Sequence, residues 1–462
     1  MSSQIRVCVI GAGAAGVCAA RHLSKPKSST SAKGGAQDLT NFLPVIYEKS
    51  DNVGGIWVYD DINENDDCLS KHSKEPPIKV HSSMYKNMYT NLPKEVMAFP
   101  DFPFPSNLSS FLHHTEVKEY LESYVQHFDL ERFINYKKEV ISVKPFVKED
   151  NKTVWKVIAR CTETGRCDTR EFDGVMVCNG HYAVPSCPDI PGLDQHFTGA
   201  KMHSHFYRIP RPFENKNVLV LGAGASGVDI GIEITKTAKK VYLSHNNRKN
   251  VSELPTNMEQ IAGVVECNGA NSFILSNGSI VDNIDVLFFC TGYKYSFPFL
   301  DNSCGIEVTT SMVKPLYKHM ININYPSMCF IGLPIQVIPF PQFDLQCQVY
   351  TNAISGARQL PGTEVMMKDF TDSLKELKEQ GRLLRHYHKM GPLQWAYNKM
   401  LARLAGVSEI PKFVENLYKD VHERRTKFLM YYKNDNFIKV LEDGNIVYVR
   451  CEDKNQLFAK RR

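Results

Sequence analysis

Two glycine-rich segments constrain the fold of this chain more than any other feature. The first is Gly11-Ala12-Gly13-Ala14-Ala15-Gly16, and the second is Gly222-Ala223-Gly224-Ala225-Ser226-Gly227. Each follows an apolar run, at 5–10 and at 217–221, that is typical of a buried strand, and each opens a helical run. Glycines at these positions allow a tight turn and bring a pyrophosphate against a helix N-terminus. Two such units predict an α/β fold with two Rossmann-like dinucleotide-binding domains.

We expect the pyrophosphate contacts to come from these turns. They are Gly11, Gly13, Ala14, Ala15 and Gly16 in the first turn, and Gly222, Gly224, Ala225, Ser226 and Gly227 in the second. After the first turn, a second strand over 43–47 ends at Glu48, with Lys49 beside it. The Glu48 carboxylate can accept hydrogen bonds from ribose hydroxyls. A Ser-, Lys- and Gly-rich insertion over 24–41 accounts for the long interval between the turn and this acid.

The second unit ends its next strand differently. After 241–244 there is no carboxylate, and the sequence reads Ser244-His245-Asn246-Asn247-Arg248-Lys249. A ribose 2′-phosphate favours cations and hydroxyls at this place, so this half is predicted to bind NADPH. Arg248 is the expected phosphate contact, with Ser244 and Lys249 as helpers. The alternative is that Arg248 lies on a surface loop and contacts no ligand.

A nicotinamide coenzyme must leave a hydride somewhere, and FAD in the first unit is the natural acceptor. A disulfide reductase would need a CxxC pair, but none of the 13 cysteines forms one. Cys8 and Cys18 flank the first turn and are interpreted as small core residues. The adjacent pair His113-His114 cannot chelate readily, so we expect no metal site.

Composition narrows the function class further. The 462 residues are 43% hydrophobic and 23% charged, with a net charge of +5, and these values are ordinary for a globular protein. The small net charge gives no sign of nucleic-acid binding. No apolar stretch reaches about 18 residues, so no membrane span is expected. Unpaired, scattered cysteines favour a reducing compartment, and the expected location is the cytoplasm.

Between the two turns lies Phe197-Thr198-Gly199-Ala200-Lys201-Met202-His203-Ser204-His205-Phe206-Tyr207, which resembles the FxGxxxHxxxY pattern of flavin-containing monooxygenases. Segments 51–57, 89–95, 290–293 and 341–343 are also similar to that family, and the resemblance spans residues 5 to about 360. In contrast, 344–348 departs from the acidic pattern that is usual there.

The resemblance implies an FAD domain built from 1–212 and 297–462, with an NADPH domain, 213–296, inserted between its parts. It also implies a reaction with dioxygen. NADPH reduces FAD, a flavin C4a-hydroperoxide forms, and an amine nitrogen or sulfide sulfur attacks its distal oxygen. Family position assigns Asn91 to orienting flavin and nicotinamide, although Asn91 could instead cap a turn before Pro93. The other expected cofactor contacts are Gly55, Ile56, Trp57, Thr291, Gly292, Gln342 and Phe343.

Several alternatives stay open at this point. The tail over 386–404 is similar to soluble fungal and insect members, and the insect comparison suggests N-oxidation of plant pyrrolizidine alkaloids such as senecionine. The competing enzymes are a Baeyer–Villiger ketone oxygenase and an uncoupled NADPH oxidase. A non-enzymatic nucleotide-binding protein is the remaining competitor. The expected partners are a small-molecule substrate and dioxygen, and the oligomeric state is open because family members often associate.

Overall fold

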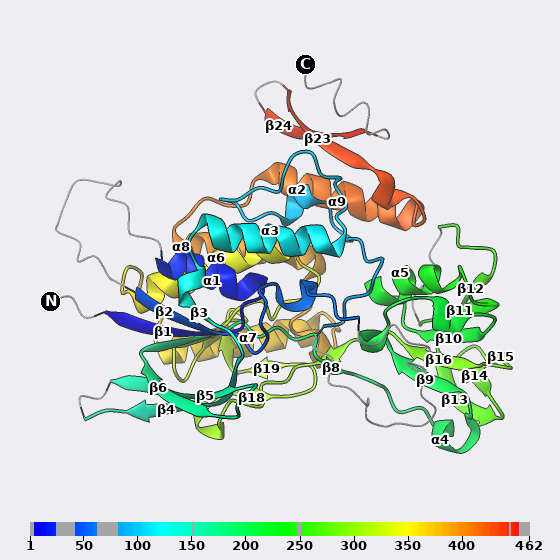
Figure 1. The fold of residues 1–462 in the computed structure, drawn as a ribbon, viewed down its shortest axis with the longest axis horizontal. Helices are drawn as coiled ribbons and strands as arrows, with labels where there is room; N and C mark the ends of the chain where they lie inside the picture. The colour runs from blue at the N-terminus through cyan, green and yellow to red at the C-terminus, as the bar shows by residue number, and fades with distance from the viewer. Residues whose placement is uncertain are drawn as a thin grey trace.

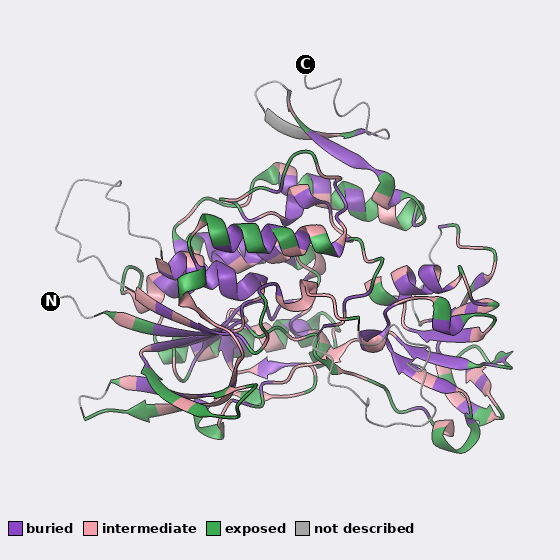
Figure 2. Cartoon of the chain, in the orientation of Figure 1, coloured by how far each residue is buried: buried purple, intermediate pink, exposed green. Residues whose placement is uncertain are grey.

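The computed structural model describes residues 4–24, 42–61, 82–149, 152–246, 252–442 and 445–451. Two separate sheets each contain one of the predicted strand–turn–helix units (Figure 1). Figure 2 shows that the central strands of both sheets are buried. The predicted α/β fold with two Rossmann-like units is therefore confirmed.

The first sheet has seven strands in the order β20–β21–β22–β7–β1–β2–β3. Its pairs are parallel from β22 to β3, and β20 and β21 add antiparallel pairs at one edge. The strands are β1 (Ile5–Ile10), β2 (Phe42–Tyr47), β3 (Ile134–Asn135), β7 (Gly174–Val177), β20 (Leu316–Tyr317), β21 (Ile321–Asn322) and β22 (Met328–Phe330).

Both faces of this sheet are covered. Val7 and Val9 of β1 pack in the core with the helices, whereas Cys8 and Ile10 pack in the core with the antiparallel sheet β4–β5–β6. Figure 1 shows the helices above the sheet and β4–β6 below it. The helices are α1 (Ala14–Ser24), α3 (His114–His127), α6 (Pro339–Ile354) and α8 (Gln394–Ala405), and the strands are β4 (Lys138–Val147), β5 (Thr153–Cys161) and β6 (Cys167–Phe172).

The second sheet is parallel throughout, in the order β12–β11–β10–β16–β9. The strands are β9 (Ala200–His203), β10 (Asn217–Leu221), β11 (Lys240–Ser244), β12 (Met258–Ile261) and β16 (Val286–Phe289), with α5 (Ala225–Ile234) after the second turn. A small antiparallel sheet packs on one face through Cys267, Phe273 and Leu275. It consists of β13 (Val264–Gly269), β14 (Ser272–Leu275) and β15 (Ile280–Val281).

Two contacts of the inserted unit involve chain that precedes the predicted bound at 213, because β9 pairs with β16 and Phe197 packs in the same core as Leu219. We propose that the second unit begins before β9. The strands β8 (Val184–Pro185) and β17 (Tyr293–Lys294) pair where the chain enters and leaves it.

The C-terminal part lies over both units. It contains α7 (Thr363–Glu379), α9 (Lys412–Lys427) and a hairpin of β23 (Asn436–Glu442) and β24 (Asn445–Cys451). The apolar face of α9, with Val414, Leu417 and Val421, packs in the core that also contains Val228 and Ile234 of α5. The tail therefore contacts the second unit directly. The remaining elements are α2 (Lys94–Met97), α4 (Leu193–His196), β18 (Glu307–Val308), β19 (Val313–Lys314) and short 3-10 turns.

One expected strand is divided. The alternation over 171–178 predicts a single strand, but Asp173 separates β6 from β7, and the two belong to different sheets. Gly174 explains the break, because an added Cβ there would lie 2.4 Å from the Tyr350 hydroxyl. The close packing of α6 thus directs the chain into the first sheet.

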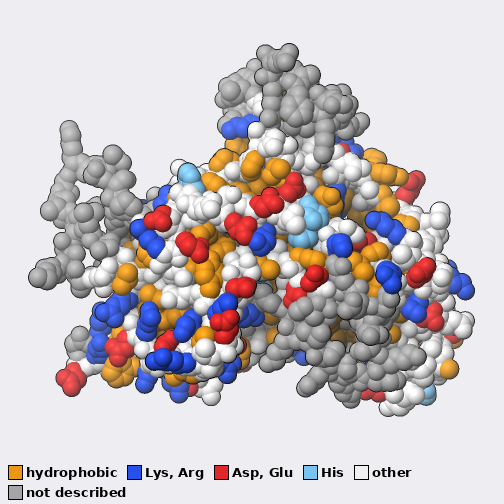
Figure 3. Space-filling model, in the orientation of Figure 1, with side chains coloured by type: hydrophobic (Ala, Val, Ile, Leu, Met, Phe, Trp, Pro, Cys, Tyr) orange, Lys and Arg blue, Asp and Glu red, His pale blue; other side chains and the backbone are white. Residues whose placement is uncertain are grey.

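The surface shown in Figure 3 carries Lys and Arg side chains over β4–β6, with acidic side chains among them. Several of these charges form ion pairs between strands of this sheet, as in Lys138–Asp168 and Arg160–Glu139. None of the helices in the described part of the chain is long and apolar enough to cross a membrane.

Candidate functional site

The first glycine turn admits only glycine at its two ends. Gly11 has φ +99°, and a Cβ there would lie 2.9 Å from the Cys178 carbonyl oxygen. A Cβ on Gly16 would lie 1.8 Å from the carbonyl oxygen of Gly11. The first helical residues, Ala14 and Ala15, are buried. The turn therefore has the tight shape that was predicted for a pyrophosphate site.

A second segment closes over this turn. Gly54 donates its N–H to the Ala12 carbonyl at 3.2 Å, and Gly55 (φ +57°) approaches so closely that its Cβ would lie 3.0 Å from the Cα of Gly13. Gly55, Ile56 and Trp57 form the 3-10 turn that follows. All three are half-buried, so the segment proposed to contact the flavin lies directly against the predicted pyrophosphate turn.

Glu48 lies at the end of β2 and is buried. One carboxylate oxygen, Oε2, accepts the Ala12 N–H at 2.8 Å, and Oε1 accepts both the N–H and the hydroxyl of Ser50 at 2.8 Å. A carboxylate offers about four acceptor positions. Oε2 therefore keeps one for a ribose hydroxyl, as the sequence predicts, while Lys49 beside it is exposed.

The second turn repeats this backbone in a more open setting. Gly222 has φ +103° and a Cβ would lie 2.6 Å from the Cys290 carbonyl oxygen, while a Cβ on Gly227 would lie 1.8 Å from the Gly222 carbonyl oxygen. In contrast, no atom of the described residues lies within 4 Å of a Cβ built on Gly224. Gly224 is the N-cap of α5 and supplies no side-chain cap. Gly224 and Ser226 are exposed and Ala225 is half-buried, so the first N–H groups of α5 are available to an anion.

The end of β11 carries the predicted 2′-phosphate contacts. Ser244 is buried, its hydroxyl donates to the Ala262 carbonyl at 2.9 Å, and it accepts the Val264 N–H at 3.2 Å. This hydroxyl is thus engaged by the backbone. Arg248 and Lys249 lie outside the described residues, and their predicted role stays a proposal.

Thr291 and Gly292 follow β16, where the chain leaves the second unit. The Thr291 hydroxyl donates to the Ser186 carbonyl, and the Gly292 carbonyl accepts from Ser186 N–H at 2.9 Å and from His203 Nε2 at 3.0 Å. Burial lowers the pKa of His203 to about 4. His203 is therefore neutral and holds this crossing point.

Asn91 lies on a loop that is held at both ends. Thr90 exchanges two hydrogen bonds with Leu112, at 2.8 and 3.0 Å, and Lys94 N–H donates to the Ser110 carbonyl at 2.7 Å. Asn91 itself is half-buried, and its amide has no hydrogen-bond partner among the described residues. It does not cap α2, whose N-cap is Pro93 with no side-chain cap. A fixed backbone with a free amide suits a ligand contact better than a turn cap.

Gln342 and Phe343 begin α6. Gln342 is fully buried, and its Nε2 donates to Asn398 Oδ1 at 3.1 Å, but its Oε1 lacks a partner. Phe343 packs on Gly332 (φ +84°), where a Cβ would lie 2.6 Å from its ring. A buried acceptor without a partner is costly, so Gln342 Oε1 fits a donor on a bound cofactor.

Three further contacts position the loops and helices around the two turns, and the sequence alone did not predict them. Arg208 is buried and donates to the carbonyls of Asp60, Ser82, His205 and Tyr207. Lys433 Nζ contacts Asp229 Oδ2 at 2.9 Å and the Tyr89 carbonyl at 3.1 Å, and Asn87 Nδ2 donates to Glu233 Oε1 at 2.7 Å. The Arg that follows the FxGxxxHxxxY pattern was a signal for the first contact. Nothing local marks Lys433, because its partners are distant in sequence.

Comparison with known proteins identifies the family. The family model described as flavin-binding monooxygenase-like matches residues 4–258 and 252–425. This chain is 35% identical over 425 residues to "Flavin-containing monooxygenase FMO GS-OX-like 4" of Arabidopsis thaliana, which covers 89% of this chain and 90% of that protein. The chain belongs to the flavin-binding monooxygenase-like family. A second Arabidopsis thaliana protein, "Flavin-containing monooxygenase FMO GS-OX5", is 34% identical over 98% of this chain and 95% of its own length.

Solved structures of this family agree with the fold. S-allyl-L-cysteine S-oxygenase from Allium sativum has a TM-score of 0.84 and 32% identity, covering 100% of this chain and 98% of its own. Cyclohexanone monooxygenase from Rhodococcus, solved with NADP⁺, has a TM-score of 0.56 and 14% identity over 88% of this chain and 98% of its own, which shows the fold alone. The chain is therefore a flavin monooxygenase, and the cofactors that this family implies are FAD and NADPH.

Proposed function

We propose that this chain uses NADPH and FAD to transfer one oxygen atom of dioxygen to a soft nucleophilic heteroatom, either a sulfide sulfur or a tertiary amine nitrogen. The observation that supports this most strongly is the whole-chain similarity to an S-oxygenase, at 32% identity and a TM-score of 0.84. Similarity to the cyclohexanone monooxygenase is far weaker in both identity and TM-score, which disfavours ketone oxygenation. Sulfide sulfur is accordingly the first substrate class to test.

In this proposal the enclosed turn at 11–16 holds the FAD pyrophosphate, and Glu48 holds its ribose. The open turn at 222–227 holds NADPH, with Arg248 and Lys249 as candidate partners of the 2′-phosphate. FAD supplies the redox and oxygen chemistry when it is reduced by NADPH. The chain's own task is to orient both cofactors and to exclude water from the reacting atoms.

Asn91 is the residue proposed to touch the reacting groups. Its amide can donate and accept without titrating, so it can contact the flavin side and the nicotinamide side across a range of pH. The clamps at Thr90 and Lys94 fix its backbone. Gln342 Oε1 and Phe343 are proposed to hold the flavin from α6, where the missing hydrogen-bond partner of Gln342 supports a polar contact.

The experiment supplies the purified chain with NADPH and isotope-labelled dioxygen and offers thioanisole, N,N-dimethylaniline, senecionine and cyclohexanone separately. We expect labelled sulfoxide as the principal product, with NADPH consumption matched by product rather than by hydrogen peroxide. Labelled N-oxide from either amine would move the assignment to nitrogen within the same proposal. Lactone from cyclohexanone as the principal product would replace the proposal with ketone oxygenation.

The Asn91→Ala variant tests the site. We expect bound flavin to be retained, and NADPH consumption to shift from labelled product to hydrogen peroxide. The matched control is Asn87→Ala, an amide of the preceding loop that contacts Glu233. Unchanged coupling in Asn91→Ala would remove Asn91 from the site, and peroxide as the sole product of the unmodified chain with every substrate would favour the oxidase instead.

A further inference from the structure

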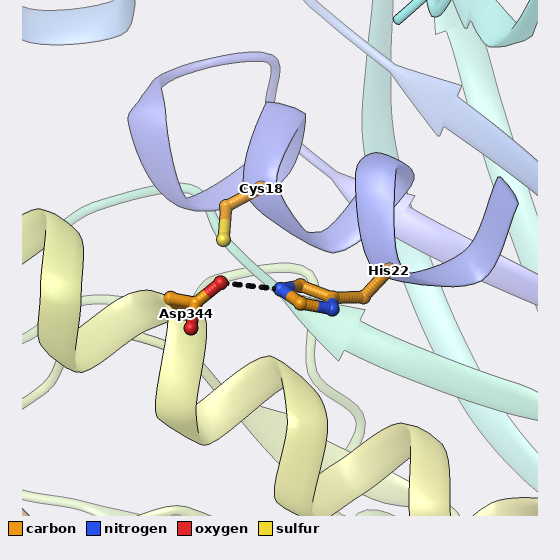
Figure 4. Close-up of side chains that lie close together, drawn as sticks. All are labelled: Cys18, His22 and Asp344. Carbon is orange, nitrogen blue, oxygen red and sulfur yellow. Dashed lines mark hydrogen bonds and ion pairs between the residues drawn. The ribbon is translucent and has the colours of Figure 1, made fainter. Parts of the chain in front are cut away.

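Three metal-ligating side chains meet between α6 and α1, the helix that follows the first glycine turn. Cys18 and His22 are four residues apart on α1 and thus share one face of that helix. Asp344 comes from α6. The Cys18 sulfur, a His22 ring nitrogen and an Asp344 carboxylate oxygen all lie within 4.8 Å of one another, and all three residues are buried. Figure 4 shows the Cys18 sulfur and the Asp344 carboxylate directed toward the space beside the His22 ring.

Neighbouring side chains already orient this group. His22 Nε2 and Asp344 Oδ1 are 2.7 Å apart, and Gln348 Nε2 donates to the other oxygen, Asp344 Oδ2, at 2.7 Å. Metal ligands in proteins are commonly fixed by such outer hydrogen bonds. The Asp344 carboxylate is therefore held in place beside the His22 ring.

We propose that Cys18, His22 and Asp344 bind one divalent cation of the Zn²⁺ class, which joins α1 to α6. A sulfur, a nitrogen and an oxygen ligand suit Zn²⁺ and Co²⁺, whereas Mg²⁺ and Ca²⁺ prefer oxygen ligands. The inference does not depend on which heteroatom the enzyme oxidises. Sequence spacing could not reveal it, because Asp344 is 322 positions from His22.

Charge balance supports the exchange. In the protonated cluster, the imidazolium and the Asp344 carboxylate cancel and the thiol is neutral. With a dication, the Cys18 thiolate and the carboxylate cancel its charge and His22 is neutral. Binding therefore replaces about two protons with one cation and leaves the buried net charge unchanged. An uncompensated charge in this core would be strongly destabilising.

The distances permit the site with small side-chain movements. Zinc bonds of about 2.3 Å to sulfur and about 2.0–2.1 Å to nitrogen or oxygen place tetrahedral ligand atoms roughly 3.3–3.8 Å apart. The 2.7 Å contact of His22 with Asp344 must open slightly, and any pair near the 4.8 Å limit must close by up to about 1 Å. The His22 and Asp344 side chains keep only 5% and 7% exposure, so a bound ion would be enclosed by protein.

The test titrates Co²⁺ into the purified, untagged holoenzyme and records the absorption bands of tetrahedral Co²⁺ at wavelengths beyond those of the flavin. We expect one Co²⁺ per chain, displacement by Zn²⁺, and release of about two protons per ion in weak buffer. The bands should be lost in Cys18→Ala and in His22→Gln. They should persist when the exposed cysteines are replaced, in Cys167→Ser/Cys187→Ser. Flavin content confirms that each variant is folded.

Two results would overturn the site. One is the absence of Co²⁺ bands in the unmodified holoenzyme, which needs no variant to interpret. The other is bands that persist in folded His22→Gln or that disappear in Cys167→Ser/Cys187→Ser, because the ion would then bind elsewhere. The Cys18→Ala and His22→Gln variants act independently, so a folding failure of one leaves the other as the test.

Discussion

The two glycine turns share one backbone but differ in what surrounds them. Gly11 and Gly222 have nearly equal φ values, +99° and +103°, and a Cβ on Gly16 or Gly227 would meet a carbonyl oxygen at the same 1.8 Å. At the middle glycine the turns diverge, because Gly13 faces Gly55, whereas a Cβ on Gly224 would meet no atom within 4 Å in the described part of the chain. The motif thus fixes the turn, and its neighbours decide how enclosed the ligand is. We infer that the first dinucleotide is retained and the second exchanges.

The helices that follow these turns are anchored by equivalent positions with different chemistry. Counted from the first glycine, Cys18 and His22 of α1 correspond to Asp229 and Glu233 of α5. The α1 pair contacts α6 through Asp344. The α5 pair contacts the C-terminal segment through Lys433 and the loop before Asn91 through Asn87. Helix α1 is therefore fixed to α6 within the first unit, whereas α5 is fixed to the C-terminal segment and to the loop before Asn91.

The largest expected effect on stability concerns the last glycine of each turn, which the two turns share. In Gly16→Ala and Gly227→Ala the new methyl would clash with a backbone carbonyl that cannot move away. We expect each to destabilise its unit by about 3 kcal/mol or more. Thermal unfolding and flavin content measure this. Gly362→Ala is the control, since Gly362 also lacks a positive φ and no described atom lies within 4 Å of an added Cβ there. Equal losses in the control would mean that replacing a glycine, and not the clash, is the cause.

The sequence predicted this shared part well because it is local. Strands at 5–10 and 217–221 have the expected bounds, since apolar runs followed by glycines determine both burial and turn. The division of 171–178 into two strands was not predictable in the same way. It depends on Tyr350 and Ile354 packing against Gly174, and those residues are remote in the chain.

The next prediction concerns the pH dependence of the contact between His22 and Asp344 that anchors α1. The pKa of His22 is about 9 in the folded protein, against an ordinary value of 6.5. The stabilisation is therefore fully present below about pH 6.5 and is lost as the pH rises through about 9. In the presence of a chelator, we expect the unfolding free energy of the unmodified chain to fall by on the order of 3 kcal/mol over this window, relative to His22→Gln.

Other groups also titrate in this range, so the test is the difference in unfolding free energy between the unmodified chain and His22→Gln at each pH. Parallel pH profiles for the unmodified chain and His22→Gln would show that the imidazolium–carboxylate pair does not anchor α1. A difference in slope confined to pH values below 6.5 would lie in the wrong pH window and would equally contradict it.

The middle glycines test the difference between the turns directly. Gly224→Ala adds a methyl in open space, so we expect unchanged stability but a KM for NADPH raised by about tenfold, because the pyrophosphate must approach this backbone closely. Gly13→Ala should lower flavin content instead and leave the KM of the flavin-loaded fraction unchanged. NADPH titrations and flavin absorbance separate the two variants. Flavin loss from Gly224→Ala would reverse the assignment of the sites.

The candidate site was predicted unevenly, for a physical reason. Glu48, Gly55 and Asn91 lie on short segments whose geometry follows from local sequence, and the structure brings the first two against the first turn. Ser244 is instead engaged by Ala262 and Val264. The cluster of Cys18, His22 and Asp344, like the contacts of Lys433, arises only when distant segments pack together.

The smallest expected effect concerns Lys433, which joins α5 to the loop of Asn91. Lys433→Met keeps the length of the side chain but removes its contacts with Asp229 and the Tyr89 carbonyl. Because these are single, partly exposed contacts, we expect the variant to lose less than about 1 kcal/mol of stability. We expect the KM for NADPH to rise about two- to fivefold, which corresponds to a similar free energy. Lys419→Met is the matched control, since Lys419 pairs with Glu415 on α9 alone.

A double-mutant cycle with Asp229→Asn sharpens this test. If Lys433 acts on NADPH binding through Asp229, the double variant should have the same KM as either single variant, because the shared contact is already lost. Additive effects would assign the influence of Lys433 to Tyr89 and its loop instead. In that case the Glu233–Asn87 contact would be the polar contact of α5 to test next for an effect on NADPH binding.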